Sequence, residues 1–258
     1  MNIVVCVKQV LDTTAEKRLT PEFCLDRSSA EAILNPFDEY AVEEALRLRE
    51  KFGGQVTAVC MGPSSAKETV RKAVAMGADK AILVSDPALA RSDTLSTAYV
   101  LSLALKKLEF DLVIFGMQST DAGTGQVPAA VAEFLGLPQL TYASHLEVEG
   151  GKATIRRVTD AGYQLLSAKL PALVSVVKGI NEPRYPALRG IMQAKRAEIP
   201  VWSCADIGAD PARVGSAGAS TRVLSALPAT PRTPGPVIKD EGTAAERIVE
   251  FLVQKKVL

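Results

Sequence analysis

Histidine, paired cysteines and aromatic residues are scarce in this sequence. It contains one histidine, His145, and four cysteines, none of them in a C-x-x-C pair. A metal site built from Cys and His ligands is therefore not expected. Free cysteines inside apolar runs are typical of small core residues in a reducing cytoplasm. Aromatic residues make up only 5% of the chain, which argues against a surface that stacks nucleic-acid bases.

The sequence also lacks a strong charge imbalance and long apolar runs. Its formal net charge is +1, so no overall field favours nucleic acid or a membrane surface. No run approaches the about 18 apolar residues that a membrane span needs. The first ten residues, MNIVVCVKQV, have no basic segment followed by a long apolar stretch, and they do not resemble a signal peptide. We therefore expect a cytoplasmic protein that is not itself a membrane protein.

What the sequence does contain is a regular alternation of strand and helix patterns. The expected strands are short apolar runs at 2–10, 55–62, 80–86, 111–116 and 137–148. The expected helices lie at 35–54, 64–77, 93–108 and 126–136, with Asn35 and either Ser92 or Asp93 as N-caps and glycines as stops. This order predicts an α/β fold with a mostly parallel sheet and a ligand site at the carboxyl ends of its strands.

The pattern changes after about residue 147. Turn residues at Gly150-Gly151 and 160–162 predict antiparallel strands added to the sheet over 147–179. Residues 210–240 are rich in Ala, Ser, Pro, Thr and Gly and predict an extended arm, followed by an amphipathic helix at 243–258. We expect an α/β domain at 1–209 and an arm with a helix at 210–258, which reaches either another subunit or its own domain.

The segment GMQSTDAGTGQVP (116–128) lies between a predicted strand and a predicted helix. It matches neither G-x-G-x-x-G nor the P-loop pattern. Its glycines would still let backbone approach a ligand, and Thr124–Gln126 would present N–H groups at a helix start, where phosphate binds favourably. Asp121 suits a loop cap or a sugar hydroxyl better than a phosphate. Nucleotide binding and an ordinary capped turn both remain open on these grounds.

Catalytic residues are hard to find in the sequence. His145 lies in a predicted strand, where a structural role is the simpler interpretation, and the serines show neither a triad order nor a nucleophile elbow. No carboxylate pair has the spacing of a hydrolase. A cofactor, or a partner, is therefore expected to supply any chemistry.

Several longer motifs give the chain a family resemblance. They are VCVKQVLDT (5–13), NPFDEYAVEEALRL (35–48), AVAMGADKAILV (73–84), GMQSTDAGTGQVPAAVAEFLGLPQ (116–139) and KLPALVSVVKGINEPRYPALRGIMQAK (169–195). Together they resemble the beta subunit of electron transfer flavoprotein, of the prokaryotic type, over essentially the whole length. The resemblance implies a Rossmann-like fold similar to the adenine nucleotide α-hydrolases, without implying hydrolysis.

The resemblance also implies partners and cofactors. The beta subunit would form a heterodimer with an alpha subunit that holds most of the FAD, and would itself bind AMP. Electrons would come from dehydrogenases such as acyl-CoA dehydrogenases and pass to a quinone oxidoreductase or another acceptor. The subunit would be an electron carrier without catalytic residues of its own. In the electron-bifurcating alternative, it would bind a second FAD that oxidises NADH.

Site residues follow from the resemblance by position. The nucleotide, AMP or FAD, would contact Cys6, Asn35, Pro36, Phe37, Asp38, Met61, Gly116, Asp121, Gly123, Thr124, Gly125, Gln126 and Val127. The segment 184–195 looks like the loop by which this family docks dehydrogenases, with Leu188 as anchor and Arg184, Tyr185, Ile191 and Met192 around it. A solvated helix start with a basic face would fit the same composition.

The sequence departs from the family at several positions. Thr13 stands where ordinary mitochondrial-type members carry a Tyr, while Asp121, Thr124 and Val127 have the spacing of the larger prokaryotic branch, which includes bifurcating members. Bifurcating members commonly have Gly-Asp after the loop Asp, where this chain has Ala122-Gly123. They commonly have Gly-Pro after the Val, where this chain has Pro128 without the glycine. A stand-alone nucleotide-binding protein of similar fold is a third possibility, against which the 184–195 motif argues.

Overall fold

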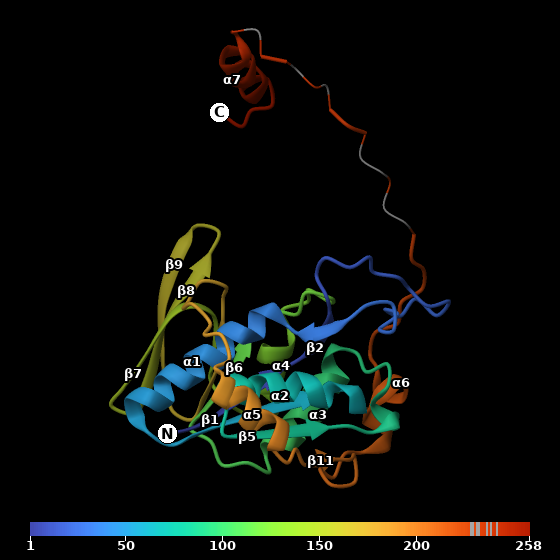
Figure 1. The fold of residues 1–258 in the computed structure, drawn as a ribbon, viewed down its shortest axis with the longest axis vertical. Coiled ribbons are helices and arrows are strands. Elements are labelled where there is room, and N and C mark those ends of the chain that lie inside the picture. The colour runs from blue at the N-terminus through green and yellow to red at the C-terminus, as the bar shows by residue number, and fades with distance from the viewer. Residues whose placement is uncertain (228–229, 231–232, 236, 238, 241) are drawn as a thin grey trace. The chain divides into compact units, whose positions relative to one another are not determined.

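A nine-stranded sheet forms the framework of the computed structural model, which describes residues 1–227, 230, 233–235, 237, 239–240 and 242–258. In sheet order the strands are β11 (Val201–Trp202), β5 (Lys80–Val84), β4 (Gln55–Met61), β1 (Asn2–Val7), β6 (Leu112–Gly116), β10 (Ala172–Val176), β7 (Gln139–Glu149), β8 (Lys152–Thr159) and β9 (Gly162–Lys169). The strands from β11 to β7 are parallel, and β8 and β9 are antiparallel. The predicted α/β fold is confirmed (Figure 1).

Helices cover both faces of the parallel strands (Figure 1). One face packs against α1 (Pro36–Phe52), α2 (Lys67–Met76) and α5 (Leu188–Arg196). The other packs against α3 (Thr94–Leu105), α4 (Val127–Leu135) and the segment around Cys204 and Val214. Because the interior strands β1, β4, β5, β6 and β10 are buried on both sides, their sequences are mostly apolar and show no alternation, whereas β7 alternates between buried and exposed residues.

Helix boundaries follow local chemistry. In α1 the proline at the first position, the acidic first turn of Asp38 and Glu39, and Gly53 with φ 71° at the end all suit a helix. Asp93 caps α3 by accepting a hydrogen bond from the Ser96 N–H at 2.9 Å, as one of the two predicted caps. The start of the second helix differs from prediction: the 3-10 turn η1 (Ser64–Ala66) precedes α2, and no side chain caps either element.

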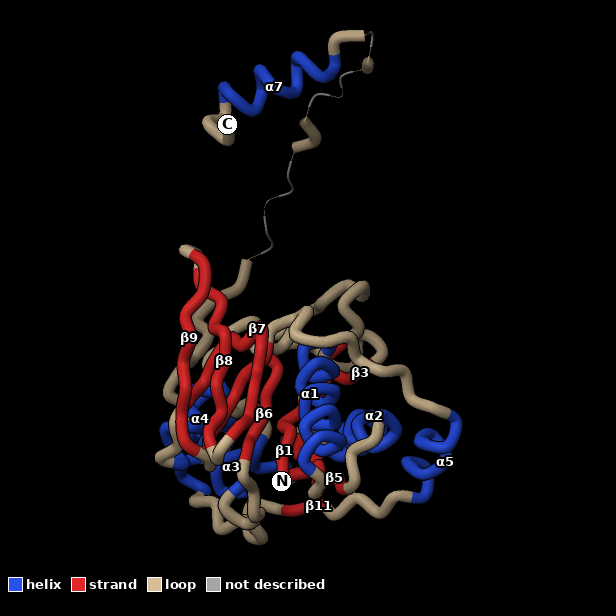
Figure 2. Tube along the Cα trace, turned by 90° about the vertical axis from the view of Figure 1, so that its left-hand side faces the viewer, coloured by secondary structure: helices blue, strands red, loops and turns tan. Residues whose placement is uncertain are grey.

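The prediction of antiparallel strands over 147–179 is right for two strands and wrong for a third. Strands β8 and β9 form an antiparallel hairpin beside β7 at the sheet edge (Figure 2). Strand β10, however, is parallel and lies between β6 and β7, in the sheet interior. All five of its residues are buried, a pattern that belongs to an interior parallel strand.

The remaining elements are short. Strands β2 (Gln9–Leu11) and β3 (Ala32–Leu34) form a separate antiparallel pair. The turns η2 (Pro87–Leu89) and η3 (Pro211–Arg213) and the single turn α6 (Gly215–Gly218) join larger elements, and α7 (Ala244–Gln254) is the predicted terminal helix. None of the helices that the structure describes could cross a membrane.

The chain divides into two compact units, Met1–Leu224 and Ser225–Leu258. Residues 210–224 belong to the first unit: Val214 is buried, and the N–H groups of Ser220 and Thr221 donate to the Asp93 carboxylate at 2.7 and 3.0 Å. The predicted arm at 210–240 includes residues 228–229, 231–232, 236 and 238, which lie outside the described residues.

Candidate functional site

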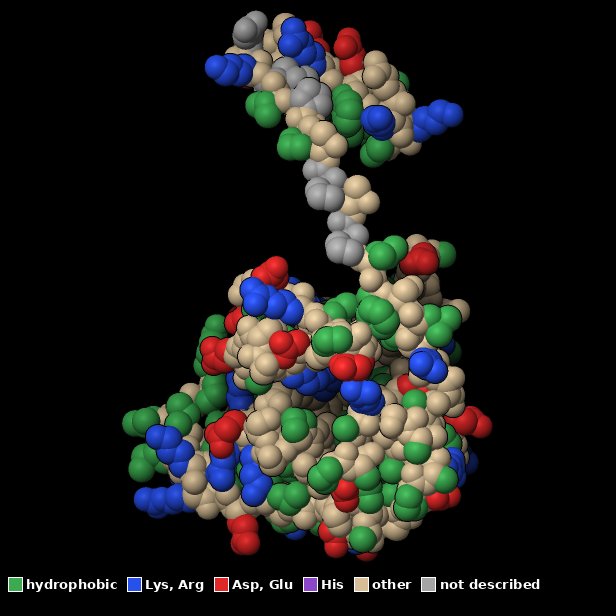
Figure 3. All heavy atoms as spheres, turned by 90° about the vertical axis from the view of Figure 1, so that its right-hand side faces the viewer, with side chains coloured by type: hydrophobic (Ala, Val, Ile, Leu, Met, Phe, Trp, Pro, Cys, Tyr) green, Lys and Arg blue, Asp and Glu red, His purple; other side chains and the backbone are tan. Residues whose placement is uncertain are grey.

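The segment that follows β6 lies where the strand order reverses. Chain order leads from β1 through β4 to β5 on one side and then back to β6 on the other side of β1. Cys6 pairs with Phe115 and Val7 with Cys60, so the carboxyl ends of β1, β4 and β6 meet at one edge. Ligands of open α/β sheets bind outside such a switch point. The face toward which these strands point carries a hollow with Lys or Arg side chains at its margin (Figure 3).

Glycines shape the loop after β6. Gly123 and Gly125 have φ of 63° and 62°, in the left-handed region that favours glycine. A Cβ on Gly123 would meet nothing within 4 Å, so a ligand could approach that backbone closely. A Cβ on Gly125 would lie 2.6 Å from the Tyr142 hydroxyl, and one on Gly116 would lie 2.7 Å from the Phe37 carbonyl carbon. Gly116 and Gly125 therefore let the protein pack against itself.

The start of α4 presents unused main-chain donors. The N–H groups of Thr124, Gly125 and Gln126 donate no hydrogen bond to any described residue, and the Gln126 side chain does not cap the helix. These groups lie at the positive end of the helix dipole. The buried hydroxyl oxygen of Thr120 also has no partner in the described part of the chain. Such a set of donors fits an anionic, hydroxyl-bearing ligand such as a nucleotide.

Asn35 ties this loop to the start of α1. Its side-chain amide donates to the Gln118 carbonyl at 2.9 Å and accepts from the Thr120 N–H at 3.2 Å. Asn35 occupies the N-cap position of α1 as predicted, but its side chain forms no capping bond, because it bonds to the loop instead. Asn35 is 1% exposed, so these bonds fix the loop from inside the protein.

Asp121 lies between two cations. Its carboxylate accepts from Lys8 Nζ and from an Arg27 Nη, each at 2.7 Å, and its side chain is 1% exposed. Burial alone would raise the pKa of this carboxyl, but the charge and hydrogen bond of Lys8, with help from Ser119 and Arg27, lower it to about 2. The sequence favoured a loop cap or a sugar hydroxyl for Asp121, whereas its carboxylate joins the end of β1 to the residues before β3.

Asp38 is buried beside the carboxyl ends of β1 and β6, and we call the space outside these two strand ends the β1–β6 crevice. Its carboxylate accepts from the Lys8 N–H at 2.8 Å and lies against Gly116. Burial raises its pKa to about 7, although the hydrogen bonds from Asn35 and Lys8 act in the opposite direction. Burial also raises the pKa of the Cys6 thiol, and raises that of Cys60 to about 12, so both cysteines are inert thiols of the core.

The structure brings most of the predicted nucleotide residues to one edge of the sheet. Cys6, Met61 and Gly116 come from strand ends, Asn35–Asp38 from the start of α1, and Asp121–Val127 from the loop and the start of α4. Sequence patterns did not predict a role at this edge for Lys8, Arg27 or Thr120. Lys8 comes directly after a buried strand, and this position could have indicated a role at the strand ends. Arg27 lies in an irregular segment, where the sequence gives no such signal.

The segment 184–195 separates into buried and exposed parts. Tyr185, Leu188, Ile191 and Met192 are 95%, 75%, 40% and 51% exposed. Arg184 differs from them, because its guanidinium binds the Glu43 and Glu50 carboxylates of α1. An apolar group therefore faces solvent on α5 and just before it, while Arg184 holds the segment to the protein.

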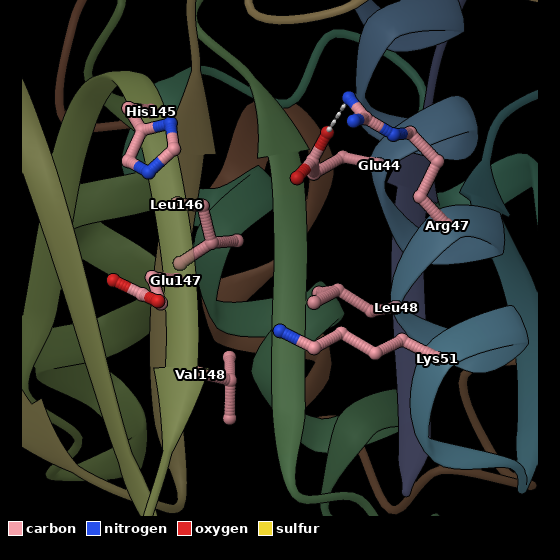
Figure 4. A pocket seen from close by; sticks show the side chains of 8 residues that line it. All are labelled: Glu44, Arg47, Leu48, Lys51, His145, Leu146, Glu147 and Val148. Carbon is pink, nitrogen blue, oxygen red and sulfur yellow. Dashed lines mark hydrogen bonds and ion pairs between the residues drawn. The ribbon is translucent and has the colours of Figure 1, made fainter.

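His145 lies apart from this site. It is exposed on β7, in a shallow recess of about 210 Å³ between β7 and α1 (Figure 4). In the described chain its side chain forms no hydrogen bond, and no carboxylate orients it as in an acid–base pair. The described residues also contain no cluster of three or more His, Cys, Asp or Glu that could hold a metal.

Comparison with known proteins agrees with this geometry. The model of the electron transfer flavoprotein domain matches residues 23–207. The electron transfer flavoprotein subunit beta of Mycobacterium leprae is 47% identical over 264 residues, covering 100% of this chain and 99% of the relative. That of Megasphaera elsdenii is 42% identical over 266 residues, covering 100% and 98%. Protein FixA of Azorhizobium caulinodans is 40% identical over 233 residues, covering 86% and 83%. The chain belongs to the beta-subunit family of electron transfer flavoproteins.

Proposed function

We propose that this electron-carrier subunit works in the cytoplasm as a heterodimer with an alpha subunit, and that its β1–β6 crevice holds AMP. The observation that carries the nucleotide assignment is the start of α4, where the N–H groups of Thr124–Gln126 have no partner among the residues that the structure describes. A phosphate would satisfy these groups and gain from the helix dipole. The open backbone at Gly123 and the unpartnered Thr120 hydroxyl add to the fit.

The bound AMP would stabilise the subunit. It would be held by main-chain groups of the loop, by Asn35–Asp38 at the start of α1, and by Cys6 and Met61 at the strand ends, as the resemblance implies. A ligand that binds only the folded state raises its stability by mass action. AMP has no redox chemistry, and the site offers no acid–base pair, so we assign it a structural role.

FAD, held mainly by the alpha subunit, would supply the electron-accepting chemistry of the heterodimer. The residues of this chain would complete the flavin environment and dock the electron donors. We propose acyl-CoA dehydrogenases or related dehydrogenases, as in fatty acid oxidation, as donors, and a quinone oxidoreductase or another carrier as acceptor.

Donor docking is assigned to the exposed apolar group Tyr185, Leu188, Ile191 and Met192. Leu188 begins α5, and Ile191 and Met192 follow three and four positions later, so the three side chains share one helix face. Exposed apolar side chains gathered in this way are typical of a protein–protein contact. Arg189, Lys195 and Arg196 add positive charge around it and would favour an acidic partner surface.

Cofactor counting tests the nucleotide assignment. The heterodimer is purified and denatured, and the released flavin and AMP are quantified by absorbance and chromatography. One FAD and one AMP for each heterodimer is the expected result. Two FAD without AMP would overturn it in favour of the electron-bifurcating alternative, in which the second FAD occupies this chain and accepts hydride from NADH. The spacing of Asp121, Thr124 and Val127 is the sequence feature that supports this alternative.

A further inference from the structure

Two carboxylates of α1 enclose Arg184, and we call this group the Arg184 clamp: Glu43, Glu50 and Arg184. The guanidinium donates to Glu43 through Nε at 2.7 Å and Nη2 at 2.9 Å, and to Glu50 through Nη1 at 2.6 Å and Nη2 at 3.3 Å. The Arg184 N–H also donates to Glu43 at 3.1 Å. The planar fork of arginine suits such paired contacts, which fix direction as well as distance.

The clamp is more than a surface ion pair. The Glu43 side chain is 7% exposed and Arg184 is 36% exposed, so one partner of this contact is buried and water screens the interaction only in part. The Glu50 side chain is half-exposed, and the hydrogen bond from Arg184 lowers its pKa. The clamp carries two negative charges and one positive charge, so Arg184 offers no free positive charge to a partner.

The clamp holds the segment that leads into α5. Between β10 and α5, residues 177–187 form neither helix nor strand. Near its middle, the Asn181 side chain donates to the Tyr40 carbonyl at 3.0 Å and to Glu44 at 2.9 Å. Arg184 is the next anchor along the chain, and Tyr185, 95% exposed, follows directly.

The far end of α5 has an anchor of its own. Arg71 of α2 donates to the carbonyls of Ala194 at 2.7 Å and Ala197 at 3.2 Å. Gly190 lies so close to α2 that a Cβ there would collide with the Ala75 carbonyl oxygen. Helix α5 is thus held by α2 at both ends, at Gly190 in its first turn and at Ala194 and Ala197 near its C-terminus, while the segment that leads into it is held by α1.

We propose that Glu43 and Glu50 are positioning residues for partner docking: by holding Arg184, they order the backbone that presents Tyr185 and Leu188. This inference rests on the proposed docking role of the exposed apolar group. Pre-ordering matters because the partner binds only the competent conformation. When only a fraction of the molecules adopt that conformation, the apparent affinity is reduced by the same fraction. Neither carboxylate needs to touch the partner for this effect.

The test compares four variants of the purified heterodimer: the double variant Glu43→Gln/Glu50→Gln, Arg184→Lys, Leu188→Ala, and Glu133→Gln as a control. Glu133 is an exposed helix carboxylate on α4 that bonds to no described residue. An acyl-CoA dehydrogenase with its acyl-CoA substrate reduces each heterodimer, and KM and kcat are measured. Hydrogen exchange is followed at the amides of Arg184, Tyr185 and Ala187.

The clamp variant should raise KM about 3- to 10-fold with kcat and flavin content unchanged, as expected when the competent conformation is less populated. Its three amides should exchange faster than those of the control. Arg184→Lys, which keeps the charge and loses the fork, should give an intermediate KM. If the double variant does not fold, Glu50→Gln alone should give a smaller change in the same direction.

The clamp and the docking assignment fail in different ways. An unchanged KM in the clamp variants, with a raised KM in Leu188→Ala, overturns the clamp and leaves docking in place. An unchanged KM in both overturns docking itself. Loss of flavin or a lowered kcat in the clamp variant would place its role in assembly or electron transfer and also overturn the inference.

Discussion

Replacing Asp121 with asparagine should destabilise the protein in a way that depends on pH. The substitution keeps the shape of the side chain and removes its charge. Lys8 and Arg27, which both donate to this carboxylate at 2.7 Å, would then face an amide and each other's positive charge. Holding two partly exposed cations near each other without a counter-charge costs free energy, and their hydrogen bonds to the loop would weaken.

The size of the effect follows from the pKa of Asp121. The difference between about 2 in the folded protein and the ordinary value of 3.8 corresponds to roughly 2.4 kcal/mol. The Lys8 and Arg27 side chains are 36% and 44% exposed, so water screens part of this interaction. We therefore expect a loss of about 1–2 kcal/mol at pH 7. Because the folded-state pKa is the lower one, this stabilisation is complete above pH 4 and disappears as the pH falls toward 2.

Urea unfolding of the two proteins at pH 7, 5 and 3 measures this difference. We expect a gap of about 1–2 kcal/mol at pH 7 and 5 and a smaller gap at pH 3. Glu16→Gln is the control, because its carboxylate is 77% exposed and its partner Arg18 is 69% exposed. A gap of equal size at all three pH values would refute the charge argument, and no gap at pH 7 would refute the stabilising role of Asp121.

Three further outcomes follow from the same contacts. Gly116→Ala should lower the free energy of unfolding, followed by thermal melts, by about 1–3 kcal/mol, because the new Cβ meets the Phe37 backbone. The control Gly235→Ala should have little effect, because a Cβ there meets nothing within 4 Å. Burial raises the pKa of Asp38 to about 7, so its contribution to stability is largest at low pH and is lost as the pH rises through 7. Asp38→Asn should remove this loss of stability, measured as the fall of the urea midpoint between pH 5 and 8. Leu188→Ala should leave the melting temperature unchanged, because the side chain is 75% exposed, and should slow electron transfer from a dehydrogenase; unchanged stopped-flow kinetics would contradict the docking assignment.

Local patterns predicted the parallel strands β1, β4, β5, β6 and β7 and the helices between them, because each of these elements carries its own signal. The buried β-branched runs, the Pro36 helix start and the glycine stops are all short-range features. Strand β10 was placed wrongly because its position depends on β8 and β9, which form a hairpin and return the chain to the sheet interior. The almost continuous apolar run ALVSV was the available sign that this segment differs from its alternating neighbours.

The candidate site could be predicted where it lies on one continuous segment, and not where distant segments meet. The glycines and helix start at 116–128 could be recognised directly. The partners of Asp121 could not, because Lys8 and Arg27 are 113 and 94 positions away in the chain. The same holds for Asn35, whose local pattern predicts a helix cap, while the folded chain brings Gln118 and Thr120 within its reach.

The partners of Asp121 also resolve a difficulty raised by the loop sequence. An aspartate beside a phosphate site would repel its ligand if the carboxylate were free. In the structure, one negative charge is shared by two cations, so Lys8, Arg27 and Asp121 together carry a net positive charge. Lys8 also donates to the Ser119 hydroxyl at 3.1 Å, which places this cluster at the base of the same loop. The acidic residue thus orders the loop, and the helix-start amides together with the surplus positive charge favour an anion. An Asp121→Asn heterodimer should consequently lose nucleotide through disorder of the loop, even though the substitution makes the site more positive.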